Sequence, residues 1–160
     1  MRTANLKPSA VVVVATVRAL KMHGGVKKTD LSIENLDALK KGMPNLLRHV
    51  KNMKNVYGLP CVVAVNAFPT DTQRELDLVI EECKKIGVNV KLSTVWADGG
   101  KGGEELAKEV VDLCEQKSDF KFAYELNCSI KEKINAVVTK VYGGKGVNYT
   151  SQAESEIELL

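Results

Sequence analysis

The sequence predicts an α/β fold, a three-layer αβα arrangement around a mainly parallel, Rossmann-like sheet with helical crossovers. Short apolar runs of strand length alternate along the chain with longer segments whose apolar residues recur at helical spacing. The first run, Ala10–Ala15, is continuously apolar, which is typical of a parallel strand covered on both faces. Strands that alternate with helices favour parallel pairing through right-handed crossovers.

The composition of the 160-residue chain is that of one globular domain, with 44% apolar and 27% charged residues. The net charge of +3 is too small to indicate nucleic acid or a membrane as a partner. No apolar stretch approaches the roughly 20 residues of a membrane span and no signal-peptide pattern opens the chain, so we expect a cytoplasmic protein. The widely spaced Cys61, Cys83, Cys114 and Cys128 favour free thiols over a disulfide or a zinc site.

Helices and a second strand are expected after the first strand. Apolar spacing predicts a short helix around Ile33–Leu39. A separate helix is predicted from Met43 to Val56, because Pro44 is tolerated in a first turn. The apolar run Pro60–Val65 then predicts the second strand.

The middle of the chain repeats the alternation. A helix is expected from about Asp71 to Ile86, starting at a capping-box pattern in Thr70–Gln73. Val88–Val95 predicts a third strand, and its alternation of apolar and polar residues places it nearer an edge of the sheet. After a glycine-rich loop, a further helix carries an apolar stripe of Leu106, Val110, Leu113 and Cys114.

The last part of the chain predicts one more strand and two helices. The alternating aromatic residues of Phe120–Tyr124 indicate a fourth strand. A capping box at Ser129 opens a helix that extends to Val141. We expect residues 1–150 to form a single α/β domain and residues 151–160 to be the start of a truncated helix, so that the chain is a piece of a longer protein.

Phe68 and Trp96 are the leading candidates for a binding site. Each follows the end of a predicted strand, and the two strands are consecutive. Because ligands of open parallel sheets bind beyond the carboxyl ends of the strands, both rings should border one crevice suited to a flat heteroaromatic ligand. A local packing pair without a ligand is the alternative.

The glycine-rich loop and a histidine are further candidates. The loop lies between a predicted strand and helix, where backbone N–H groups could hold a phosphate or carboxylate, although it could equally be a flexible hinge. Its residues are Gly99, Gly100, Lys101, Gly102 and Gly103. His23 follows the first strand and is expected on the same rim as Phe68 and Trp96, either as an active-site residue or as an ordinary loop histidine. His49 is expected to be structural.

Two other function classes stay open at this point. The segment from Val62 to Asp71 resembles the Asn-Lys-x-Asp turn of P-loop GTPases, but Ala67 replaces the lysine and Pro69 the aspartate, which disfavours a guanine site. A non-catalytic α/β interaction or scaffold module is the other alternative.

Four segments together resemble the formate–tetrahydrofolate ligase family, also called formyltetrahydrofolate synthetase. They are Val13–Gly25, Val65–Thr72, Trp96–Gly103 and Lys145–Thr150. The resemblance covers essentially the whole chain, in order, and identifies it as an internal or C-terminal-half fragment of such an enzyme.

The resemblance implies a cytosolic one-carbon enzyme that uses ATP, Mg²⁺ and formate to make formyl phosphate and transfers the formyl group to N10 of tetrahydrofolate. It implies that the pterin ring lies between Phe68 and Trp96, beside Pro69 and Leu92. The implied partners are the remainder of the parent subunit and, for the full-length enzyme, three further copies in a homotetramer. Neither nucleic acid nor a membrane is implied.

One motif of the family is missing from this sequence. The phosphate-binding G-x-x-x-x-G-K-[ST] loop does not occur in it. Because that loop and its lysine bind the nucleotide phosphates, we assign no catalytic residue in this chain and expect no ligase activity of the isolated chain.

Overall fold

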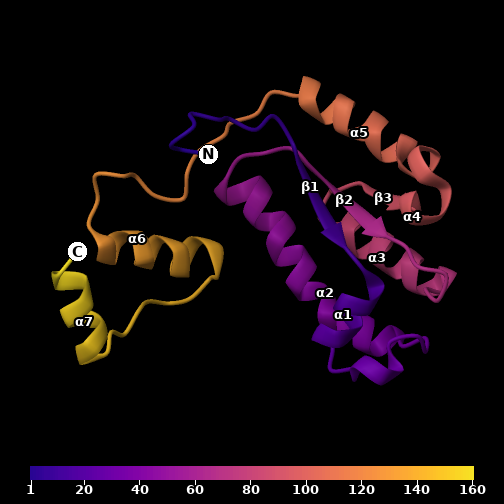
Figure 1. Cartoon of the computed structure of the whole chain (residues 1–160), viewed down its shortest axis with the longest axis horizontal. Coiled ribbons are helices and arrows are strands. Elements are labelled where there is room, and N and C mark those ends of the chain that lie inside the picture. The colour runs from indigo at the N-terminus through magenta and orange to yellow at the C-terminus, as the bar shows by residue number, and fades with distance from the viewer.

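The fold is built around a parallel three-stranded sheet, described for residues 1–160 in a computed structural model (Figure 1). The strands are β1 (Val11–Ala15), β2 (Cys61–Asn66) and β3 (Val90–Ser93). They lie in the order β1-β2-β3, so β2 is central and β3 forms one edge. The parallel α/β prediction is confirmed, as is the edge position of the third strand.

Helices connect the strands and follow the last of them. In chain order they are α1 (Val17–His23), a 3₁₀ turn (Lys28–Asp30), α2 (Leu36–Lys51) with a π-helical turn (Asn52–Val56), α3 (Gln73–Lys85), α4 (Val95–Asp98), a 3₁₀ turn (Gly99–Gly103), α5 (Glu104–Glu115), α6 (Ile130–Ala136) with a π-helical turn (Val137–Val141), and α7 (Ser151–Glu158). No helix combines the length and the apolar character needed to cross a membrane.

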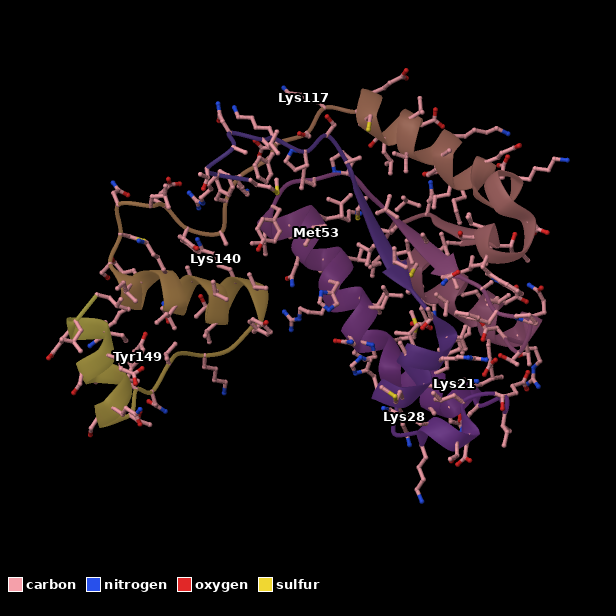
Figure 2. All side chains as sticks on the ribbon, in the orientation of Figure 1. Lys21, Lys28, Met53, Lys117, Lys140 and Tyr149 are labelled. Carbon is pink, nitrogen blue, oxygen red and sulfur yellow. The ribbon has the colours of Figure 1, made fainter.

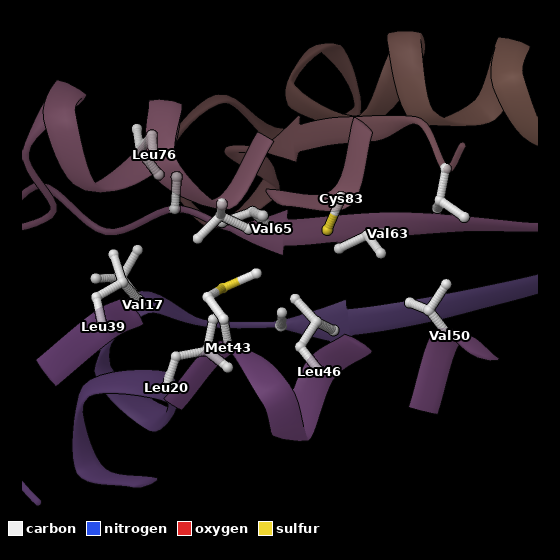
Figure 3. Packing of buried hydrophobic residues seen from close by; sticks show 14 of the residues in the cluster. Val17, Leu20, Leu39, Met43, Leu46, Val50, Val63, Val65, Leu76 and Cys83 are labelled. Atoms are coloured by element: carbon white, nitrogen blue, oxygen red, sulfur yellow. The ribbon is translucent and has the colours of Figure 1, made fainter. Parts of the chain in front are cut away.

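The main hydrophobic core lies on one face of the sheet, under α1, α2 and α3 (Figure 3). Side chains alternate between the faces of a strand, so Cys61, Val63 and Val65 of β2 all point into this core. The helices contribute the rest of the cluster, which includes Val17, Leu20, Leu39, Met43, Leu46, Val50, Leu76, Val79 and Cys83. Burial raises the pKa of the Cys83 thiol to about 11, with smaller contributions from Glu82 and Cys61, so this cysteine packs as a small neutral side chain.

The opposite face of the sheet is covered only in part. Val62 and Ala64 of β2 are buried there, and α5 contacts both β2 and β3 on that side. On this face no helix shields Val14 of β1, which is 67% exposed. The expectation that the first strand is covered on both faces is therefore wrong, because β1 is an edge strand and its apolar run is shielded on one face only.

The two helices predicted between Ile33 and Val56 are one continuous helix, α2 with its π-helical turn. Pro44 lies inside it rather than in a first turn. The proline removes the hydrogen bond to the carbonyl of Lys40, but both residues are exposed, so water can replace that bond. The buried face is held by close packing on α1, where a Cβ on Gly42 would lie 1.9 Å from the carbonyl oxygen of Leu20.

The predicted fourth strand over Phe120–Tyr124 is not formed. Its backbone makes isolated bonds, among them Asp119 N–H to the Gly58 carbonyl at 3.0 Å, and no ladder. The aromatic alternation serves side-chain packing instead: Phe120 and Phe122 meet edge to face with centroids 4.9 Å apart, and the guanidinium of Arg2 lies 3.7 Å from the Phe122 centroid. The chain then leads to α6 and α7, which lie beyond α2 as seen from the sheet (Figure 1).

A buried ion pair joins three elements below the carboxyl end of the sheet. Lys21 of α1 and Glu75 of α3 are fully buried, with Nζ and Oε1 2.8 Å apart. Lys21 also donates to the carbonyl of Ile33, and Glu75 accepts from the backbone N–H groups of Asn35 and Thr72 at 3.1 Å. Figure 2 shows Lys21 among the helices, whereas Lys28 extends outward. Every charge of the pair is thus compensated, as burial requires.

Glu75 also corrects the predicted start of α3. The capping box consists of Thr72 and Glu75, not of Thr70–Gln73, because the Thr72 hydroxyl accepts from Glu75 N–H while Glu75 accepts from Thr72 N–H. The box predicted at Ser129 is confirmed, with Glu132 as its partner. One carboxylate, Glu75, therefore serves both the helix start and the buried ion pair.

We predict that Lys21→Met destabilises the chain by about 3 to 5 kcal/mol, because it leaves the Glu75 carboxylate buried without its partner. Urea unfolding measures the loss. Adding Glu75→Gln should recover part of it, since no charge then remains buried. The exposed Lys28→Met is the control and should change the free energy of unfolding by less than about 0.5 kcal/mol. A loss below about 1 kcal/mol in Lys21→Met would contradict the assigned role.

A second prediction concerns acid stability. Burial alone would raise the pKa of Glu75, but the bond from Lys21 and the N–H groups of Thr72 and Asn35 outweigh it and hold the pKa below its ordinary value of 4.5. The resulting stabilisation is fully present above pH 4.5 and is lost as the pH falls through the lower pKa of the folded state. At pH values below the ordinary pKa of Glu75, the urea concentration at the unfolding midpoint should therefore fall. The drop should be smaller in the Glu75→Gln variant, and an equal drop would contradict the prediction.

Candidate functional site

The rings of Phe68 and Trp96 lie together beyond the carboxyl end of the sheet. Phe68 follows β2, and Trp96 lies in the short helix α4 directly after β3. Their centroids are 6.4 Å apart and their planes are inclined by 17°. The structure thus brings the two predicted rings to one rim, and Trp96 remains 56% exposed. Binding of a flat ligand by the two rings stays a prediction.

Hydrogen bonds connect the two ring-bearing segments. The indole Nε1 of Trp96 donates to the carbonyl oxygen of Ala67 at 2.8 Å. The N–H of Ala67 in turn donates to the carbonyl of Ser93, at 3.1 Å. Ala67 therefore joins the end of β2 to both the end of β3 and the indole, and this bond limits rotation of the Trp96 ring.

A closed turn positions Phe68. Its N–H donates to Oδ2 of Asp71 at 2.9 Å, and Asp71 N–H donates back to the Phe68 carbonyl at the same distance. Thr72 caps α3, and Asp71 instead holds the turn before it. Burial raises the pKa of Asp71, and Glu75 adds to the rise, while the Phe68 N–H, Lys21 and Arg18 oppose it.

Arg18 is a residue of this site that the sequence analysis missed. Its guanidinium carbon lies 4.9 Å from the centroid of Phe68, within the range of a cation–π contact. One terminal nitrogen donates to the hydroxyl of Thr70 at 3.0 Å. The available signal was its place in the first turn of α1, which begins directly after β1 and hence at the same rim.

Pro69 and Leu92 lie on the same two segments. Pro69 follows Phe68 in the turn and is exposed. Leu92 pairs with Val65 across the sheet and is 37% exposed near the end of β3. Their positions are compatible with apolar margins of a site around the rings, and their contact with a ligand stays a prediction.

The glycine-rich loop forms a compact 3₁₀ turn, Gly99–Gly103, between α4 and α5. The carbonyl of Gly102 accepts from Thr94 N–H at 3.1 Å, and Lys101 is exposed. Glu104 and Glu105 occupy the first turn of α5. Negative side chains in a first turn complement the positive end of the helix dipole, which disfavours a bound anion there.

His23 lies apart from the rings. It is the last of the seven residues of α1, so it is displaced from the rim by the length of the helix, about 10 Å. It lines a cavity of about 300 Å³ together with Val14 and His49, beside the uncovered part of β1. The expectation that His23 lies in a loop is wrong, because α1 continues through it. A role of His23 in the site stays a prediction.

A comparison with protein-family models gives an independent result. The model described as formate–tetrahydrofolate ligase matches residues 1–160. The match includes every candidate residue described above.

We predict that Gly102→Ala displaces α4 and, with it, Trp96. A Cβ at this position would lie 2.5 Å from the carbonyl carbon and 2.7 Å from the carbonyl oxygen of Thr94, so the backbone must move. The chain has one tryptophan, so a shift in its emission and easier quenching by acrylamide report the displacement. The control, Gly100→Ala, points into open space and should change neither quantity. Identical spectra of the two variants would contradict the prediction.

Proposed function

The chain belongs to the formate–tetrahydrofolate ligase family, and we propose that it is the folate-binding side of that enzyme. The family consists of ATP-dependent ligases that use ATP and tetrahydrofolate. In the proposed role, Phe68 and Trp96 bind the pterin ring of tetrahydrofolate, and Pro69 and Leu92 border it.

The observation that carries this proposal is the pair of nearly parallel rings, 6.4 Å between centroids, in which Phe68 is half-buried and Trp96 is exposed. A pterin is a flat heteroaromatic ring, and stacking on aromatic faces is the contact that suits it. A flat ring inserted between two aromatic faces needs about 7 Å between them, because each contact takes about 3.5 Å. The pair must therefore open slightly on binding, and the exposed indole has room to do so.

The chemical steps that involve phosphate are assigned to the remainder of the subunit. This sequence has no G-x-x-x-x-G-K-[ST] loop to hold ATP and its Mg²⁺. We propose that this chain binds and orients tetrahydrofolate so that N10 faces formyl phosphate formed elsewhere. By itself it should not catalyse formyl transfer.

We predict that Trp96→Ala raises the Michaelis constant for tetrahydrofolate about tenfold in the full-length ligase that contains this segment. The lost stacking contributes about 0.5 to 1.5 kcal/mol beyond the lost burial, and 1.4 kcal/mol corresponds to a factor of ten. Phe68→Ala should act similarly. In the 160-residue chain, tetrahydrofolate should quench the fluorescence of Trp96, which is its only tryptophan.

Phe122→Ala is the matched control, because it removes an aromatic ring that packs against Arg2 rather than against Trp96. It should leave the Michaelis constant for tetrahydrofolate unchanged. An unchanged constant in Trp96→Ala would remove the indole from the folate site and favour the plain interaction module instead.

A further inference from the structure

The unpaired polar atoms of this chain are concentrated at the ring pair. Only two buried side-chain polar atoms lack a hydrogen-bond partner: Nε of Arg18 and Oδ1 of Asp71. One belongs to a cation and the other to a carboxylate, and both residues contact Phe68 directly. Buried polar groups are nearly always paired, so two exceptions that flank one side chain need a local explanation.

The nearby ion pair between Lys21 of α1 and Glu75 of α3 is a useful comparison, because it stabilises the fold. Lys21 lies one turn after Arg18 on α1, and its partner Glu75 lies one turn after Asp71. Both groups are fully buried, and their contacts satisfy the charges on both sides. No ion pair or hydrogen bond joins Arg18 and Asp71, although a direct ion pair would have satisfied both unpaired atoms. The paired arrangement of Lys21 and Glu75 is therefore not repeated here.

The contacts that Arg18 and Asp71 do make all define the position of Phe68. Asp71 accepts from its backbone N–H at 2.9 Å. Arg18 lies 4.9 Å from its ring centroid and is itself held by the hydroxyl of Thr70. One residue thus fixes the backbone and the other supports the ring.

We propose that Arg18 is a positioning residue for folate recognition, which holds the ring of Phe68 in the orientation that meets the pterin. The inference rests on the proposed function of the ring pair. Arginine suits this role because its planar guanidinium lies over an aromatic face while a terminal nitrogen bonds Thr70, and the ammonium of lysine cannot reproduce both contacts. Arg18 acts through Phe68 and has no assigned contact with the reacting atoms.

The test compares Arg18→Met with Lys21→Met in the full-length ligase that contains this segment. Arg18→Met should raise the Michaelis constant for tetrahydrofolate about three- to tenfold, as expected for the loss of one cation–π support. Its kcat, its Michaelis constant for ATP and its melting temperature should stay close to those of the parent enzyme. Lys21→Met should lower the melting temperature markedly, because it breaks a satisfied buried pair.

A melting temperature of Arg18→Met as low as that of Lys21→Met would overturn the proposal, because Arg18 would then be structural. So would an unchanged Michaelis constant for tetrahydrofolate in Arg18→Met. If Arg18→Met fails to fold, Arg18→Lys decides: a raised constant at unchanged melting temperature supports the proposal, and an unchanged constant contradicts it. Trp96→Ala distinguishes failure of the Arg18 proposal from failure of the proposed function. An unchanged Michaelis constant for tetrahydrofolate in Trp96→Ala contradicts the proposed function itself.

Discussion

The buried ion pair between Lys21 and Glu75 is the constraint on which the carboxyl end of the sheet depends. Both charges are removed from water, so each must be met by a charge or hydrogen bond, and the partners come from three separate segments. Satisfying them fixes α1, the start of α2 and the start of α3 relative to one another. A hydrophobic contact at this place would tolerate sliding, whereas the ion pair and its N–H bonds accept only one arrangement.

The positions of Phe68 and Trp96 depend on this buried ion pair. With α3 fixed at Glu75, the turn before it is fixed as well, and Asp71 closes that turn on the backbone of Phe68. Across the sheet, the parallel pairing of β2 and β3 brings α4 beside the same turn, and the indole of Trp96 bonds the Ala67 carbonyl. The orientation of the two rings is thus a consequence of helix and strand positions set below them.

Periodicity in the sequence was enough to predict the parallel sheet, most helices and the meeting of Phe68 with Trp96, since the carboxyl ends of neighbouring parallel strands share one rim. The failures have physical causes. Pro44 does not interrupt α2 because its missing hydrogen bond faces water, and the alternating aromatics after Phe120 have no strand to pair with. The contacts of Lys21 with Glu75 and of Arg18 with Phe68 join residues far apart in sequence, so spacing could not predict them.

The contrast between the Lys21–Glu75 ion pair and the unpaired atoms of Arg18 and Asp71 connects stability with the proposed function. Insertion of a flat ring needs about 7 Å between aromatic faces, more than the 6.4 Å between the present centroids, so one wall of the site has to yield. The completely satisfied pair, Lys21 with Glu75, keeps the base in place. Phe68 is held by Arg18 and by the turn that Asp71 closes, so the exposed indole of Trp96 is the wall that has to move. A fixed base under one movable aromatic wall is the arrangement expected of a site that opens to admit a flat ligand.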